Sequence, residues 1–374
     1  MAESFIKRLE LAVRRRYNTW VTRGADPLVV EAPAAQSFVK PDARILLLRQ
    51  DRIGDVLVST PIIAAIRACY PHATIGMVLS TNNTAVAYTV EPYVDRIHVF
   101  RKSVVDLVRL RRELRRSAYD VVIDLMDNPS STSALLMQGS RAPIAIGVDK
   151  ENRRVYTHVV PLADRTAVHI VERIARVTWP LGFDIPREEL RPKLPGVTPH
   201  TSVDPHAGPN QSYILGINIS GSDLDRMYPE SLLAEVLHQV CSSFEGARTA
   251  GRLELVVMSA PHHREIAERI GQQLDARVLP PRPSFSAFAE AIGHCDMFLT
   301  PDTSAVHVAA AYNIPSVVLF AQDDRLLLPW FPYATRNWAC IAHNAPLAAI
   351  PTSDVVRHLT AMIHEITGLN PGAS

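Results

Sequence analysis

The chain has 374 residues, of which 47% are hydrophobic and 21% are charged, and its formal net charge is +1. This composition is typical of a globular protein large enough for two domains, and the near-neutral charge gives no general reason to expect nucleic-acid binding. The four cysteines are far apart and form no CxxC pair, which argues against a zinc site or a disulfide framework and favours a reducing compartment. We find neither a secretory signal nor a stretch as long as a membrane span, so we expect a cytoplasmic protein.

Residues 1–40 are predicted to form an extension ahead of the fold. Within residues 1–23, six basic side chains accompany two acidic ones, and apolar residues are interleaved among them. Two interpretations remain open. The segment is either a basic amphipathic helix that lies on an anionic membrane or a solvated helix that caps the first domain.

From residue 44 onward, apolar runs typical of buried strands alternate with helical patterns. Strands are predicted at 44–49, 74–79, 96–100, 119–124 and 143–147, and helices at 56–70, 81–90, 103–117, 130–140 and 167–181. This alternation predicts βαβ units and a parallel sheet, which we assign to a first domain over residues 41–185.

A proline-rich segment, residues 186–212, is predicted to be an extended linker. A second α/β set follows over residues 213–350. Its strands are expected near 213–219, 253–258, 277–279, 296–299 and 316–320, and its helices near 229–243, 261–274, 284–293 and 303–312. The tail, residues 351–374, contains a final helix over 351–367. Two α/β halves of similar size predict a cleft between them, which is a common location for ligand sites.

The segment Arg49–Asp55, with the sequence RQDRIGD, follows the first predicted strand. Gly54 allows close backbone approach, and Asp55 is expected at the strand-to-helix turn, where ligands bind in open α/β sheets. Taken alone, the motif favours the simpler interpretation, a carboxylate in the first helical turn, where the helix dipole favours an anion.

Two loops of the second half combine small or hydroxylated residues with a following helix. Ser220-Gly221-Ser222 ends a strand, and Arg226 follows before the next helix, so backbone N–H groups and a cation are available for a phosphate. Asp302-Thr303-Ser304 likewise opens an alanine-rich helix that carries His307 one turn further on. An ordinary loop and a structural histidine are the alternatives for these residues.

Other chemistries find less support. Asp223-Leu224-Asp225 resembles a metal-binding DxD, but its flanking order differs and no further ligands accompany it, so we expect no metal ion. No glycine-rich dinucleotide motif follows the first strand, which argues against a Rossmann dehydrogenase. A basic stretch is expected either to face an anionic acceptor or membrane or to be a solvated helix face; it consists of Arg101, Lys102, Arg109, Arg111, Arg112, Arg115 and Arg116.

In this order, the motifs resemble glycosyltransferase family 9, the lipopolysaccharide heptosyltransferases. Each motif is modest, whereas the ordered set is specific. The matching pieces are Ile45–Pro61, Tyr119–Asp124, Ile146–Gly147, His169 with Val171–Arg173, Ser220–Glu230 and Asp302–His307.

The resemblance implies a GT-B fold, in which two Rossmann-like parallel-sheet domains face each other across a cleft. It implies that residues 41–185 hold the acceptor, that residues 213–350 hold the nucleotide sugar, and that the final helix packs back on the N-terminal domain. The family transfers heptose from ADP-heptose to the lipopolysaccharide inner core with inversion and without a metal or cofactor. A cytoplasmic location, at the inner face of the inner membrane, and an anionic glycolipid partner follow from this activity.

The resemblance also assigns roles to residues. The base that accepts the acceptor's proton is Asp55, and a nucleoside contact is expected from His263. Donor binding is assigned to Ser220, Gly221, Ser222, Arg226, Asp302, Thr303, Ser304 and His307. The candidate acceptor contacts are Arg52, Arg101, Lys102 and Asp124.

Several positions depart from the family pattern: Arg226 and Tyr228 stand where Lys and Trp are frequent, Ser304 where some members have Gly, and His263 where some have an acidic residue. These departures leave the donor's base and sugar open. One alternative is therefore a related transferase that uses another nucleotide sugar for capsule, O-antigen or protein glycosylation. A second is a non-catalytic relative that binds a nucleotide sugar, although the presence of Asp55 and Arg226 argues against it.

Overall fold

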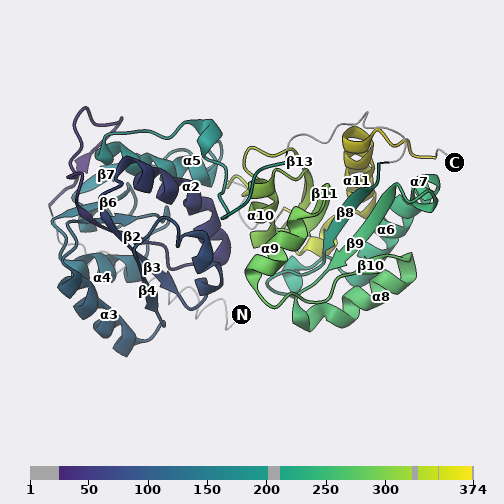
Figure 1. Ribbon diagram of the computed structural model, residues 1–374, viewed down its shortest axis with the longest axis horizontal. Coiled ribbons are helices and arrows are strands. Elements are labelled where there is room, and N and C mark those ends of the chain that lie inside the picture. Colours follow the sequence, from purple (N-terminus) through teal and green to yellow (C-terminus); the bar gives the residue numbers. More distant parts are fainter. Residues whose placement is uncertain (1–24, 201–210, 322–326, 344, 373–374) are drawn as a thin grey trace. The chain divides into compact units, whose positions relative to one another are not determined.

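The computed structural model describes residues 25–200, 211–321, 327–343 and 345–372, and the chain divides into two compact units (Figure 1). Unit 1 consists of the described residues up to Asp164 together with Ile170–Leu190, and unit 2 consists of Arg165–His169 and the described residues from Arg191 onward. Each unit is a parallel sheet covered by helices on both faces, so the predicted pair of parallel-sheet α/β domains is confirmed.

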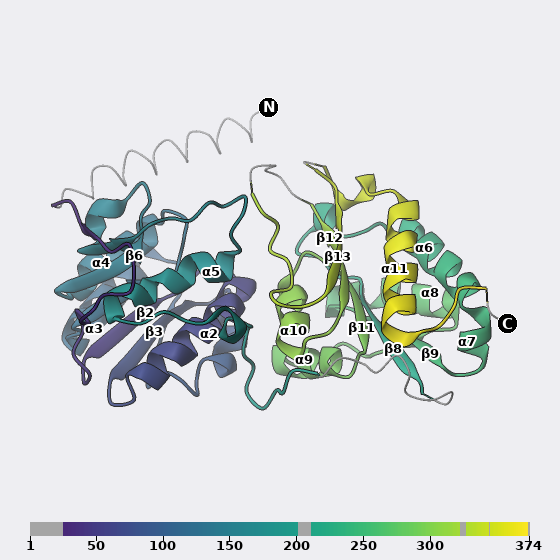
Figure 2. The same ribbon diagram turned by 90° about the horizontal axis from the view of Figure 1, so that it is seen from above.

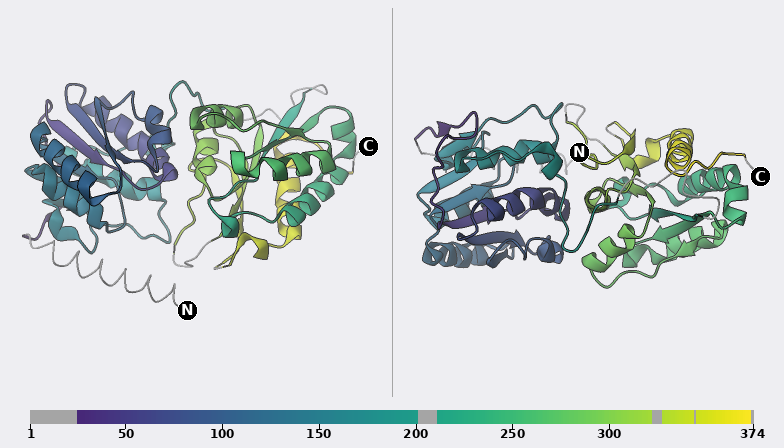
Figure 3. Two further views of the ribbon diagram at one scale, coloured as in Figure 1. Left: turned by 90° about the horizontal axis from the view of Figure 1, so that it is seen from below. Right: turned by 45° about the horizontal axis from the view of Figure 1, so that its top comes forward.

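The sheet of unit 1 has the strand order β1-β7-β6-β5-β2-β3-β4, and every pair is parallel. Helices α3 and α4 cover one face, where their leucines pack on β2 and β5, and α2 and α5 cover the other (Figures 1 and 3). The strands are β1 (Leu28–Val29), β2 (Arg44–Leu48), β3 (Thr74–Ser80), β4 (Arg96–Phe100), β5 (Val121–Asp124), β6 (Ile144–Val148) and β7 (His158–Val160), and the helices are α2 (Ile53–Cys69), α3 (Val104–Ser117), α4 (Ser131–Ser140) and α5 (Ile170–Ala175).

The sheet of unit 2 has the order β10-β9-β8-β11-β12-β13 and is also parallel throughout. Helices α6, α8 and α11 cover one face, and α9 and α10 pack together on the other. The strands are β8 (Tyr213–Asn218), β9 (Leu253–Met258), β10 (Arg277–Val278), β11 (Met297–Pro301), β12 (Ser316–Phe320) and β13 (Asn337–Ile341), and the helices are α6 (Glu230–Ser243), α7 (Glu245–Thr249), α8 (Arg264–Leu274), α9 (Phe285–Gly293), α10 (Ser304–Tyr312) and α11 (Thr352–Thr367).

Three predicted segment assignments need correction. The final helix, α11, lies beside α6 (Figure 2), and its residues Val355 and Leu359 are buried in the core of unit 2, so the helix belongs to unit 2. Its predicted packing on the N-terminal domain stays a prediction. Part of the predicted linker is ordered, because the guanidinium of Arg191 donates to Ala310 O at 2.8 Å and to Thr335 Oγ1 at 2.7 Å. Part of the predicted extension belongs to the first sheet, where β1 pairs with β7. Residues 1–24 of the predicted extension and 201–210 of the predicted linker lie outside the described residues.

Two of the predicted helices differ from the elements observed. The predicted helix at 81–90 is a short 3-10 helix, Thr84–Thr89. The one predicted at 167–181 is α5 followed by a 3-10 helix, Arg176–Leu181, which contains Pro180, a residue that cannot donate an α-helical hydrogen bond. Among the described residues, no helix is both long and apolar enough to cross a membrane.

Candidate functional site

Asp55 lies in the first turn of α2, which begins at Ile53, and not in the turn before the helix as predicted. Its Oδ2 accepts the backbone N–H of Arg52 at 3.0 Å, and its Oδ1 lies 3.3 Å from Nη2 of Arg49. The residue is 9% exposed. Two donors and the positive end of the helix dipole therefore stabilise the carboxylate anion, as the first-turn interpretation requires. Its role as a base stays a prediction.

The guanidinium of Arg49, which is 1% exposed, organises this end of the sheet. Its Nε donates to the carbonyl oxygen of Asp55 at 2.8 Å, and its Nη1 donates to that of Leu125 at 2.7 Å. Nη1 also lies 3.3 Å from Oδ2 of Asp51. Burial alone would lower the pKa of Arg49, but the carboxylates of Asp51 and Asp55 outweigh it and raise the pKa. Arg49 therefore ties the end of β2 to the end of β5 and holds two carboxylates.

Asp51 is a functional candidate that the sequence did not single out. Its Oδ1 is buried and has no hydrogen-bond partner among the described residues, while its Oδ2 faces Arg49. Burial raises the pKa of Asp51 to about 7; Arg49 opposes this rise, and Asp55 adds to it. The available signal was the second acidic residue of the RQDRIGD segment, four positions before Asp55.

We predict that Asp51→Asn stabilises the protein in a pH-dependent way. The pKa of Asp51 rises from an ordinary value of 3.8 to about 7 in the folded state, so folding favours its protonated form, and this contribution is lost as the pH rises from about 4 to about 7. The variant should melt at a temperature similar to that of the wild type near pH 4, and the difference should reach at least about 2–4 °C at neutral pH and then level off. Thermal denaturation between pH 5 and 8 tests this, and a difference that does not change with pH would contradict it.

The predicted contact of Asp124 with the acceptor needs correction, because the residue is 0% exposed. Its Oδ2 accepts from Lys150 Nζ at 3.0 Å and from the Tyr156 hydroxyl at 2.7 Å. A second buried ion pair lies nearby in sequence, where Arg173 Nη2 is 2.9 Å from Asp127 Oδ2. These carboxylates are fully engaged in holding β5 to the segments around it and offer no surface to a ligand.

The other three candidate acceptor contacts are accessible. Arg52 is exposed at the start of α2, and Arg101 and Lys102 are exposed in the loop between β4 and α3. Because β2 and β4 run parallel in one sheet, these residues and Asp55 lie at the same, carboxyl edge of unit 1. The arrangement is compatible with binding of an anionic acceptor, which stays a prediction.

In unit 2, the predicted Ser-Gly-Ser loop follows β8 and is held in place by its neighbours. Asn218 Nδ2 donates to Thr300 Oγ1 of β11 at 3.0 Å, and Ser220 Oγ accepts the backbone N–H of Ala260 at 2.8 Å. A Cβ on Gly221 would collide with the carbonyl oxygen of Arg226, so only glycine permits this close approach of the two backbones. Ser222 is exposed.

Arg226 and Asp302 join the two predicted phosphate-binding loops. Arg226 Nη1 lies 3.3 Å from Asp302 Oδ2, and both side chains are partly accessible, at 26% and 31%. Thr303 caps α10 by accepting the N–H of Ala305 at 3.3 Å, and Ser304 is half-buried beside it. Since β8 and β11 are adjacent parallel strands, a cation, a glycine loop and a helix N-terminus converge at one sheet edge, which is a suitable site for a phosphate.

The two histidines have different environments. His263 Nδ1 lies 3.0 Å from Ser220 Oγ, and burial together with the neighbouring His262 lowers the pKa of His263, which favours the neutral ring. His307 is 4% exposed within α10, with its ring centroid 6.1 Å from that of Trp330. Contact of His307 with a donor therefore requires movement of the side chains that cover it, and both donor roles stay predictions.

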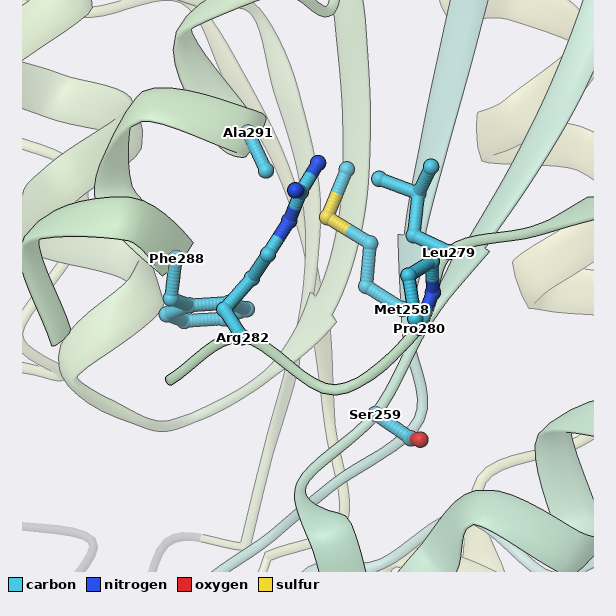
Figure 4. A pocket seen from close by; sticks show the side chains of 7 residues that line it. All are labelled: Met258, Ser259, Leu279, Pro280, Arg282, Phe288 and Ala291. Carbon is cyan, nitrogen blue, oxygen red and sulfur yellow. The ribbon is translucent and has the colours of Figure 1, made fainter. Parts of the chain in front are cut away.

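A small pocket lies where β9 and β10 end (Figure 4). Met258 and Phe288 give it apolar walls, and Arg282 extends between them. The hydroxyl Oγ of Ser259 is buried at its side and has no hydrogen-bond partner in the described part of the chain. This pocket could not be predicted from the sequence, because its residues come from three separate segments of the chain. The described residues contain no group of three or more His, Cys, Asp or Glu side chains that could hold a metal ion.

The comparisons with known proteins agree with one another. The family profile "Glycosyltransferase family 9 (heptosyltransferase)" matches residues 107–358. The chain is 24% identical to lipopolysaccharide heptosyltransferase 3 of Escherichia coli over 84% of this chain and 97% of that protein. It is 23% identical to lipopolysaccharide heptosyltransferase 1 of Pseudomonas aeruginosa over 75% and 79%.

Two solved structures share the fold. A glycosyltransferase family 9 protein from Veillonella parvula superposes with a TM-score of 0.67 at 19% identity, covering 88% of this chain and 100% of that one. E. coli heptosyltransferase WaaC with ADP-2-deoxy-2-fluoro heptose superposes with a TM-score of 0.62 at 18% identity, covering 84% and 98%. The profile match begins after Asp55 and therefore does not include the acceptor-side motif.

Proposed function

Because the chain belongs to glycosyltransferase family 9, the heptosyltransferase family, we propose that it transfers heptose from ADP-heptose to a lipopolysaccharide inner-core or related glycan acceptor. The observation that carries the proposal is the pairing of Arg226 with Asp302 at adjacent strand ends, which brings a glycine loop and a helix N-terminus together. Support for the donor comes from WaaC, whose structure contains an ADP-heptose analogue, and support for the acceptor comes from the named lipopolysaccharide enzymes.

On the donor side, the diphosphate of the nucleotide sugar accepts hydrogen bonds from backbone N–H groups of the Ser220–Ser222 loop and of the first turn of α10. The guanidinium of Arg226 supplies positive charge as the bond to the sugar breaks and ADP leaves with the electron pair. Only Nη1 of Arg226 contacts Asp302, so its other N–H groups can donate to phosphate oxygens. His263, beside the loop, is proposed to contact the nucleoside.

On the acceptor side, Asp55 accepts the proton of the attacking hydroxyl as the new C–O bond forms at the anomeric carbon. Attack from the face opposite the leaving diphosphate inverts that carbon. We propose that Arg226 and the two loops provide the charge stabilisation, so that no metal is required. The reaction then produces ADP, the extended glycan and a proton held by the carboxylate.

We predict that Arg226→Ala weakens binding of ADP-heptose by roughly 10- to 100-fold, the usual value of a charged hydrogen bond to phosphate. Isothermal titration calorimetry with ADP-heptose measures this directly, and Arg226→Lys should recover part of the loss. The matched control is Arg264→Ala in the same unit, since Arg264 is 61% exposed and, among the described residues, its ion pair is with Glu268 on its own helix.

The function itself is tested by transfer from ADP-heptose to truncated lipopolysaccharide in the presence of EDTA. Transfer that survives EDTA supports the proposal. Binding of a different nucleotide sugar in a donor panel, with no binding of ADP-heptose, would move the assignment to the capsule, O-antigen or protein glycosylation alternative. Donor binding without transfer to any acceptor offered would favour a non-catalytic relative.

A further inference from the structure

Helix α3 of unit 1 has an exposed apolar patch at its N-terminal end. Val104, Val105 and Val108 are 79%, 81% and 42% exposed. Single exposed valines are ordinary, but these three occupy positions i, i+1 and i+4 and therefore form one continuous surface on the helix. The opposite side of α3 is buried, where Leu110 and Leu114 pack in the core of unit 1.

The same solvent face continues with arginines. Arg109, Arg112, Arg115 and Arg116 are exposed along it, and Arg101 and Lys102 are exposed in the loop before it. We call this surface, Val104, Val105, Val108 and the exposed arginines of α3, the α3 face. In the described part of the chain, no carboxylate pairs with Arg112, Arg115 or Arg116.

The acidic residues of α3 do not neutralise this charge. Asp106 is buried and accepts the backbone N–H of Arg101 at 2.6 Å and Nε of Arg109 at 2.8 Å. Glu113 is shared among Arg96, His98 and Arg109. Both carboxylates are therefore committed to local contacts, and the α3 face presents uncompensated positive charge beside exposed aliphatic side chains.

We propose that the α3 face docks on an anionic lipid membrane. The combination fits a helix that lies in the interface, because aliphatic side chains enter the boundary between headgroups and acyl chains while arginines bind lipid phosphates. Arginine is also enriched in protein interfaces, but the patch contains none of the Tyr, Trp, Phe or Met side chains that accompany it there, and no aromatic platform for nucleic-acid bases.

This docking deepens the proposed function, because it brings the enzyme to an acceptor carried by lipid. Only this purpose, and not the binding to lipid itself, rests on the proposed function. Helix α3 begins at the carboxyl end of β4, the same sheet edge at which Asp55 lies. Binding to lipid does not depend on the donor, so it can be measured even if the donor assignment fails.

The test is sedimentation of the full chain with vesicles of phosphatidylcholine alone or mixed with phosphatidylglycerol. We expect tighter binding to the anionic vesicles that weakens with added salt. The double variant Val104→Ser/Val105→Ser should lower the partition coefficient by roughly tenfold. The triple variant Arg112→Gln/Arg115→Gln/Arg116→Gln should lower it by roughly 100-fold, at about 1 kcal/mol for each arginine, and should also flatten the salt dependence. The matched control is Arg264→Gln/Arg357→Gln, two exposed arginines of unit 2, which should bind like the wild type.

Two further measurements separate the possible outcomes. Both α3 variants should retain the wild-type melting temperature and transfer to a soluble acceptor, so a loss of lipid binding cannot come from unfolding or from a wrong function assignment. No binding by the wild type to anionic vesicles, or equal binding by wild type and both variants, would overturn the proposal. A change in oligomeric state in the variants, measured by light scattering, would instead identify the α3 face as a contact between copies of the chain.

Discussion

Arg49→Met is expected to lower the free energy of unfolding of unit 1 by about 3–5 kcal/mol, as is typical when one partner of a buried ion pair is removed. Arg49 is 1% exposed and contacts the carboxylates of Asp51 and Asp55 and the carbonyl oxygen of Leu125. Methionine preserves much of the side-chain length but leaves these three acceptors without their donor. Urea denaturation at pH 7, followed by circular dichroism, measures the loss.

A matched control is Arg112→Met, because Arg112 is exposed on α3 and pairs with no carboxylate in the described part of the chain. It should change stability by no more than about 0.5 kcal/mol. Adding Asp51→Asn to Arg49→Met should recover part of the loss, since it removes one of the two carboxylates left unpaired. A loss below about 1 kcal/mol for Arg49→Met would show that the buried network does not hold the sheet edge together.

Much of the fold could be predicted from the sequence because the central strands are apolar runs bounded by helical patterns. β2 and β9, for example, were located to within one residue. The unpredicted strands β1, β7 and β13 lie at or near the sheet edges, and β1 and β7 have only two and three residues. Such short segments bury too few side chains to leave a pattern, and their pairing depends on distant strands.

The position of the two loops that we propose to bind the donor could be predicted because their pattern is local: a strand end, small residues and a helix start are adjacent in the sequence. The carboxylates of unit 1 could not be sorted in the same way. Asp51, Asp55 and Asp124 all follow or end buried strands. Asp124 is fully buried, whereas one oxygen of Asp51 has no hydrogen-bond partner among the described residues. The difference comes from Lys150 and Tyr156, which reach Asp124 from more than twenty residues away.

The largest effect on activity is expected from Asp55→Asn, which should lower kcat by about 10²–10⁴-fold if the carboxylate accepts the acceptor's proton. Asparagine keeps an oxygen that can accept the Arg52 N–H, and so preserves the start of α2, but it cannot take up a proton at neutral pH. The affinity for ADP-heptose should stay unchanged, because all of the proposed donor contacts belong to unit 2. Steady-state transfer to truncated lipopolysaccharide and calorimetry with ADP-heptose measure the two quantities separately.

The control that separates chemistry from structure is Asp51→Asn, which alters the other carboxylate held by Arg49 and should retain far more activity than Asp55→Asn. Both variants weaken contacts of the same guanidinium, so a loss of activity caused only by disturbance of Arg49 would appear in both. A kcat for Asp55→Asn within a few-fold of the wild type would leave Asp55 as a helix-start residue with no part in proton transfer. A collapse of kcat in Asp51→Asn alone would transfer the role of base to Asp51, whose pKa of about 7 suits proton exchange at neutral pH.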